Sequence, residues 1–279
     1  MAILECVVLL ICVAFYCASS IAKTSTEFPI ELLSGSNYVS TEVLLLIRSL
    51  FAVIIWSICG ALLFDKAGLV LDIAMRNKKN KKIHLKHFER FAPFTVWCWC
   101  IQGVYFTIAA CSSAGILPAQ QKALPCVAWV LFELSFSVAY LVSAVVSFVL
   151  IPATVKRGLP LDNFFRPWPL IMHNANVVFV AVEMVLNRLP FTPHHHPFVL
   201  LYACTYVLFA WFWFQRNGYF FYFFLDYAST YAVLWYLALL ALLLLCFSGG
   251  VFVSSLVGQG SYTAIAALAV VTVMVQRVR

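Results

Sequence analysis

Long runs of apolar residues, separated by short polar segments, make up most of this chain. Each run is close to the roughly 20 residues that an α-helix needs to cross the hydrocarbon core of a bilayer. The pattern predicts an all-α, polytopic transmembrane helix bundle of about seven to eight spans, forming one integral membrane domain over residues 1–279. The expected spans are 1–22, 43–64, 91–112, 125–151, 171–189, 197–214, 231–249 and 251–275.

Two boundaries in this pattern stay open at the level of sequence. The last two spans are separated only by weak breaks, at 248–250 (Ser-Gly-Gly) and at 258–260 (Gly-Gln-Gly). The first run, 1–22, is either a retained helix or a cleaved signal peptide, because it ends in a small-residue sequence that resembles a cleavage site. No lysine or arginine precedes its apolar core, which favours the retained helix.

The composition excludes a water-soluble domain. Hydrophobic residues make up 64% of the chain, charged residues only 10%, and the mean hydropathy is +0.96. A soluble domain needs roughly a quarter of its residues charged to cover its surface. We therefore expect an integral, multi-pass membrane protein of the endomembranes or the plasma membrane.

Lysine and arginine concentrate in alternate connections between the expected spans, and this predicts the orientation. The segment 65–90 is the most basic, and Lys156, Arg157, Arg166 and Arg216 fall on the same side. Because such residues are enriched on the cytosolic side, we expect the basic loop 65–90 to be cytosolic. The loop is expected to attract anionic lipid headgroups and shows no signature of nucleic-acid binding.

The cysteines and histidines form no recognisable metal or cofactor motif. There is no C-x-x-C pair, and the ten cysteines lie in or beside apolar runs, where free cysteine packs as a small hydrophobic residue. The histidines 194–196 are neighbours on a turn, and three adjacent side chains cannot easily converge on one ion. We expect no metal, no cofactor, and a solvated loop at 194–196.

Polar side chains inside two of the spans are the candidates for chemistry. His173 opens the span 171–189, and Thr95 lies at a similar depth in the span 91–112. Polar groups in a membrane helix are costly unless they line a protein interior or a cavity, so they count as candidate site residues. Both are expected near the cytosolic side, where the two side chains can meet if their helices are neighbours.

Each of these spans also carries a polar stripe. Asn176, Glu183 and Asn187 follow the histidine at offsets that share one quadrant of a helix. On the other span, Gln102 shares a face with the threonine. Such stripes either join helices through hydrogen bonds or line an active site. On spacing alone, helix packing is favoured.

Short motifs around these residues resemble one family of membrane enzymes. A Leu-Asp-Asn-Phe segment at 161–164 precedes the histidine, and Glu183 with the next methionine follows it ten residues on. Upstream, the threonine precedes Gln102 by seven residues, and the later segment 223–226 ends in Phe-Leu-Asp. Together they resemble the androgen-induced gene product and androgen-dependent TFPI-regulating protein family of multi-span membrane threonine hydrolases, and more distantly the rolling stone-like proteins.

The resemblance covers roughly residues 43–250 and implies a specific activity. It implies a lipid ester hydrolase acting on fatty acid esters of hydroxy fatty acids or similar lipids, with Thr95 as nucleophile and His173 as its base. The interval from 161–164 to the histidine is one residue shorter than in the vertebrate members, and 65–90 is longer and more basic. These departures bear on the range of substrates.

The mechanism also requires supporting groups. Asn176, one turn beyond His173, is the first candidate donor to an oxyanion, and Gln102 is the second. Asp162 or Asp226 would orient the imidazole, which burial is expected to keep neutral, the state that a general base needs. The alternative is a non-catalytic membrane protein, a transporter or scaffold, whose polar seam packs helices or passes a small solute.

Overall fold

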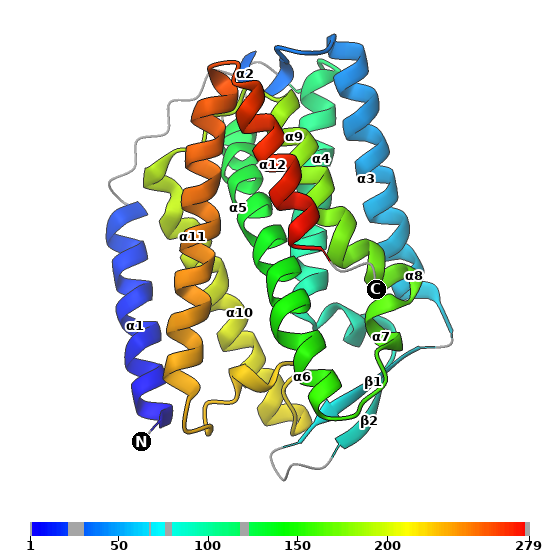
Figure 1. Ribbon diagram of the computed structural model, residues 1–279, viewed down its shortest axis with the longest axis vertical. Coiled ribbons are helices and arrows are strands. Elements are labelled where there is room, and N and C mark those ends of the chain that lie inside the picture. The colour runs from blue at the N-terminus through cyan, green and yellow to red at the C-terminus, as the bar shows by residue number, and fades with distance from the viewer. Residues whose placement is uncertain (1, 22–30, 67, 76–79, 118–122, 277–279) are drawn as a thin grey trace.

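The computed structural model confirms a polytopic helix bundle (Figure 1). It describes the chain except for residues 1, 22–30, 67, 76–79, 118–122 and 277–279. Seven helices in the described part are long and apolar enough to cross a membrane, so the chain is an integral multi-pass membrane protein. Their main segments are α1 (Ala2–Ile21), α3 (Thr41–Phe64), α4 (Phe94–Ser113), α5 (Ala123–Val145), α9 (Asn176–Leu186), α10 (His196–Asn217) and α11 (Ala232–Gly258).

Two of the spans contain a π-helical turn, in which i→i+5 hydrogen bonds accommodate an extra residue. The turn η2 (Val146–Leu150) joins α5 to α6 (Ile151–Lys156). The turn η3 (Ile171–Ala175) follows α8 (Pro167–Leu170) and leads directly into α9. Each helix is continuous, but the direction in which its side chains point shifts at the turn. Such turns occur frequently at functional sites.

The last two spans differ from the sequence-based expectation. Helix α11 runs through the first expected break, at 248–250. Gly250 there packs closely against the ring of Phe191, since an added Cβ would lie 2.4 Å from its Cε1. The turn comes later, at Gly260, which has a φ of +78°. Helix α12 (Tyr262–Met274) has 13 residues. At 1.5 Å per residue it is about 20 Å long and returns only part of the way across the bundle.

Helix α5 is the central element of the bundle (Figure 1), with 72% of its most apolar stretch buried. It packs against α4, α9, α10 and α11, while α3 packs on α4 and α1 packs on α10 and α11. The described short elements between these helices are α2 (Glu31–Ser34), η1 (His87–Phe91), α7 (Asp162–Phe165), η4 (Pro193–His195) and η5 (Phe223–Leu225).

The basic segment 65–90, expected as a loop, contains an antiparallel hairpin. Strand β1 (Leu69–Ala74) pairs with β2 (Asn80–Leu85), with the first residue of β1 opposite the last of β2. Arg90 holds it to the end of α3: its guanidinium donates to the carbonyl oxygens of Leu62 (2.6 Å) and Asp65 (2.5 Å). We call the end of the bundle that carries this hairpin, together with α6 to α8, the basic end (Figure 1).

Candidate active site

A cavity of about 190 Å³ at the basic end is lined by both Thr95 and His173, with no hydrogen bond between Nδ1 of the imidazole and the threonine hydroxyl. Thr95 comes from the first turn of α4, and His173 comes from the π-helical turn η3. Strand β1, the connection from α6 to α7 and the aromatic segment 220–223 complete the lining. The two side chains therefore face one interior space from separate helices.

Thr95 lies at the start of α4, where the chain enters the helix through Pro93. Its side chain is buried, with 8% of the residue exposed. The first backbone N–H groups of a helix have no partner within it and form the positive end of the helix dipole. The hydroxyl of Tyr222 lies against these groups, because it interacts with the backbone of Phe94 and with both the backbone and the side chain of Thr95.

Tyr222 is thus a polar neighbour of Thr95 in the cavity wall. Burial raises the pKa of its hydroxyl to about 12, although hydrogen bonding to Thr95 acts in the opposite direction. At neutral pH the phenol is therefore protonated and able to donate a hydrogen bond. Sequence analysis gave no reason to select this tyrosine.

His173 presents an unused nitrogen. Its Nδ1 is buried and has no hydrogen-bond partner among the described residues. The ring lies beside Phe164, with centroids 6.3 Å apart, and the backbone carbonyl of His173 accepts a hydrogen bond from the hydroxyl of Ser143. The residue is held through its backbone while the imidazole stays free to accept a proton.

The structure does not bring the two predicted orienting aspartates into this cavity. Asp162 is an exposed residue at the start of α7. Asp226 accepts a hydrogen bond from the backbone N–H of Ala228 (2.9 Å) and so shapes the turn before α11. Neither lines the space that holds Thr95 and His173.

Asn176 and Gln102 also lie outside the cavity lining. Gln102 donates to the backbone carbonyl of Asn176 (3.3 Å), and the side-chain Oδ1 of Asn176 accepts from the backbone N–H of Val177 (2.7 Å). The π-helical turn explains why Asn176 does not share the direction of His173. One extra residue in a turn shifts the face by roughly 100°, so regular helical spacing does not hold across η3.

A second cavity, of about 90 Å³ and almost entirely apolar, meets the first at the threonine. It lies between α5, α10 and α11, and its wall contains side chains such as Leu141, Val207 and Leu243. Thr95, Tyr222 and one leucine of η2 line both cavities. The hydroxyl group thus lies at the junction of an apolar space and a more polar one.

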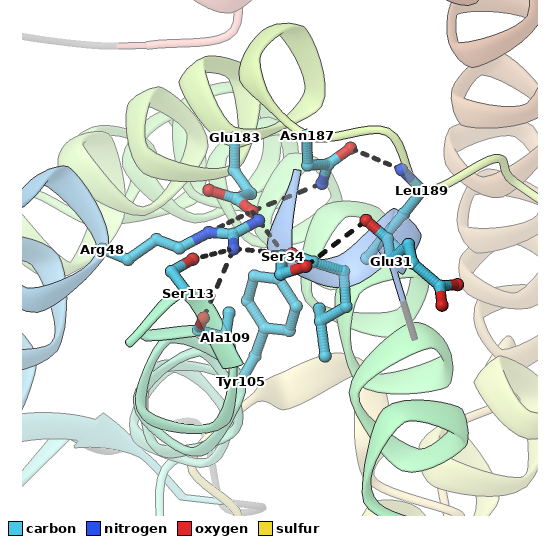
Figure 2. Close-up of polar contacts among 10 residues, drawn as sticks. Glu31, Ser34, Arg48, Tyr105, Ala109, Ser113, Glu183, Asn187 and Leu189 are labelled. Carbon is cyan, nitrogen blue, oxygen red and sulfur yellow. Dashed lines mark hydrogen bonds and ion pairs between the residues drawn. The ribbon is translucent and has the colours of Figure 1, made fainter. Parts of the chain in front are cut away.

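Glu183 and Asn187, the residues of the predicted polar stripe that lie farthest from His173, belong to a buried hydrogen-bonded cluster and not to the cavity (Figure 2). Near the opposite end of the bundle, Arg48 forms an ion pair with Glu183, with Nη2 and Oε1 2.6 Å apart. Tyr105 donates to the same oxygen (2.6 Å), Asn187 lies within 3.4 Å of it, and Ser113 accepts from the arginine (2.7 Å). This cluster joins α3, α4 and α9, so here the helix-packing interpretation applies.

The histidine triplet is not simply a solvated loop, as the sequence led us to expect. His195 is 2% exposed, and its Nδ1 lies 2.7 Å from Oε2 of Glu133 on α5. A buried carboxylate within a span needs a partner, and the connection before α10 supplies it. The signal was present in the sequence as an acidic residue inside an apolar run. Among the described residues, no group of three histidine, cysteine, aspartate or glutamate side chains is placed to hold a metal ion.

The fold and site define a multi-pass membrane helix bundle with a threonine and a histidine in one cavity near the end of the spans. No family model, no curated protein and no solved structure matches this chain.

Proposed function

We propose that this protein is an intramembrane lipid ester hydrolase that uses Thr95 as nucleophile and His173 as general base. The observation that carries the proposal is that these two side chains, from separate helices, line one cavity. A threonine hydroxyl becomes a useful nucleophile when a neighbouring base takes its proton. Nδ1 of His173 forms no hydrogen bond to Thr95 or to any other described residue, so the role of base requires the imidazole to come within hydrogen-bond reach of the hydroxyl when substrate binds. The resemblance to membrane threonine hydrolases assigns the same roles.

The reaction proceeds in two halves. The Thr95 oxygen attacks the ester carbonyl carbon while His173 accepts the hydroxyl proton. The tetrahedral intermediate then expels the alcohol part, which takes that proton, and an acyl-threonine remains. Water, activated by the same imidazole, attacks the acyl-threonine and releases the carboxylic acid. The net reaction consumes one ester and one water and gives one acid and one alcohol.

The negative charge on the tetrahedral oxygen needs hydrogen-bond donors. We assign this role to the Tyr222 hydroxyl, because it lies at the threonine and remains protonated. The backbone N–H groups at the start of α4 hold this hydroxyl in place. Asn176 and Gln102 are not assigned, since each is engaged elsewhere and neither lines the cavity.

The surroundings suit a lipid substrate. The apolar cavity beside Thr95 accepts an acyl chain, and a chain dissolved in the bilayer reaches it without crossing water. The basic end faces the cytosol in this proposal, because the lysines and arginines concentrate there. The exposed Lys81 and Lys82 of β2 then attract anionic headgroups. Fatty acid esters of hydroxy fatty acids are the substrate class that the resemblance implies.

The test is hydrolysis of such an ester by detergent-purified protein. Thr95→Ala and His173→Ala are expected to lower kcat by about 10³-fold or more, as removal of a nucleophile or its base does in serine hydrolases. Thr205→Ala and His194→Ala are matched controls, because both residues are exposed and outside the cavity. A fluorophosphonate probe is expected to label wild-type Thr95.

Retention of normal turnover in the Thr95→Ala or His173→Ala protein, with each variant eluting as a folded monodisperse species, would remove the basis of this proposal. Labelling that persists in Thr95→Ala would place the nucleophile elsewhere. Thr95→Ser distinguishes chemistry from packing, because it keeps the hydroxyl and is expected to retain activity.

A further inference from the structure

The cavity at the basic end contains a positively charged side chain that the proposed chemistry does not use. Arg157, which ends α6, lines this cavity together with Thr95 and His173. Its guanidinium carbon lies 5.1 Å from the centre of the Phe223 ring, a cation–π contact that favours this position of the group. No ion pair joins Arg157 to a carboxylate in the part of the chain that the structure describes. The residue is exposed, like Arg166, but it lines the cavity, and an unpaired guanidinium there is suited to bind an anion.

The two cavities have opposite character. The side chains that line the apolar cavity include no charged residue, whereas the basic-end cavity adds Arg157, Asn163 and Thr154 to the catalytic pair. Thr95 lies where they meet. An ester with its carbonyl at Thr95 therefore extends one arm into each cavity, and the arms must differ in polarity.

We propose that Arg157 is the specificity residue of the hydrolase, and that it binds a free carboxylate on the alcohol part of the ester. The inference rests on the proposed function and deepens it by assigning an orientation. The acyl chain occupies the apolar cavity between α5, α10 and α11, and the acid-bearing alcohol lies towards the hairpin. The planar guanidinium matches a carboxylate through two parallel hydrogen bonds.

Asp72 of β1 also borders the cavity and bears on this assignment. Its charge opposes an anion, but Lys82 lies directly opposite it in the hairpin and supplies a nearby positive charge. The aspartate is therefore expected to weaken binding of the carboxylate without preventing it. Asp72→Asn should raise the preference for an acidic ester.

The experiment compares two substrates. The first is a fatty acid ester of a hydroxy fatty acid with its carboxylate free, and the second is the same molecule with that carboxylate blocked as a methyl ester. Full-length protein in detergent or nanodiscs is used. Wild type is expected to prefer the free acid. Arg157→Ala is expected to lower the ratio of kcat/KM for the free acid to that for the methyl ester by about 10-fold, mainly through KM. Arg157→Lys is expected to recover part of the ratio.

Arg166→Ala is the matched control. Arg166 is exposed at the same end of the bundle but does not line the cavity, so its removal lowers the local positive charge while leaving the ratio unchanged. If Arg157→Ala and Arg166→Ala lower the ratio of kcat/KM values equally, the preference for the free acid comes from the overall positive charge of the basic end. That result would overturn the inference.

The remaining outcomes separate the inference from the proposed function. Hydrolysis of both esters at the same kcat/KM by wild type leaves the hydrolase standing and overturns the role of Arg157. Faster hydrolysis of an ester that carries a phosphate in place of the carboxylate overturns the carboxylate assignment. Hydrolysis of none of these esters overturns the proposed function, and this inference with it.

Discussion

Among individual residues, Tyr222 connects the structure of the site most directly to the proposed chemistry. It comes from the segment between α10 and α11, and its hydroxyl lies against Thr95 at the start of α4. Since the pKa of the phenol is about 12, the proton is retained through the neutral range. A neutral donor fixed beside the nucleophile stabilises negative charge that develops on the substrate oxygen.

Replacement of this donor provides a prediction. Tyr222→Phe keeps the ring and removes the hydroxyl, so kcat is expected to fall by about 10²-fold, the usual effect of losing one oxyanion donor. Tyr219→Phe is the control, because Tyr219 belongs to the same segment but lines neither cavity. Steady-state hydrolysis by the purified variants gives the measurement. Equal kcat for wild type and Tyr222→Phe would exclude the donor role.

The sequence predicted two of the candidate residues at this scale. Thr95 and His173 were selected because a polar group in an apolar span is unusual, and the structure places both in the lining of one cavity. Tyr222 gave no such signal, since tyrosine is ordinary in an aromatic segment at a membrane interface. Asn176 was assigned from regular helical spacing, and the π-helical turn that breaks this spacing is produced by packing around η3 and has no pattern of its own in the sequence.

Among the secondary-structure elements, the β1–β2 hairpin was the least predictable. Its strands are six residues each, and the lysines of 65–90 dominate the sequence pattern. In the structure Leu69, Leu71 and Ile73, at alternate positions of β1, line the cavity that contains Thr95. The segment from which the orientation of the chain was predicted thus also forms a wall of the cavity. The long apolar runs, by contrast, predicted the transmembrane helices, because a run of about 20 apolar residues is long enough to cross a bilayer.

The anchor of the hairpin can be tested separately from its charge. Arg90→Lys keeps the positive charge but loses the planar fork that reaches the carbonyl oxygens of Leu62 and Asp65. The hairpin is expected to detach more often, and trypsin is expected to cleave at Lys81 and Lys82 several-fold faster. Lys86→Arg serves as a control with unchanged charge. Identical cleavage rates in Arg90→Lys and wild type would show that this anchor is dispensable.

For the whole molecule, the bundle separates two kinds of polar group. The cavity lined by Thr95 and His173 lies at the basic end, whereas the buried cluster around Arg48 and Glu183, drawn in Figure 2, lies towards the other end of the bundle. The first has an unpartnered imidazole nitrogen, while the second joins three helices through charge-assisted hydrogen bonds. Stability and chemistry are therefore expected to respond to different substitutions.

This separation predicts the effect of Glu183→Gln. The substitution leaves Arg48 buried without its counter-charge, so the free energy of unfolding is expected to fall by about 3 kcal/mol. Catalytic turnover per folded molecule is expected to stay near that of wild type. Glu42→Gln at the exposed start of α3 is the control. Unfolding in mixed SDS micelles measures the first quantity. Loss of turnover without loss of stability would contradict the separation.

The position of α1 bears on how the acyl chain of the proposed substrate would enter the apolar cavity. Leu10 is its one residue in the wall of the apolar cavity, and this helix packs on α10 and α11. Helix α1 therefore forms part of the wall between that space and the outside of the bundle. An outward movement of α1 would open the apolar cavity to the acyl chains of the surrounding lipid, while the remaining helices keep their positions.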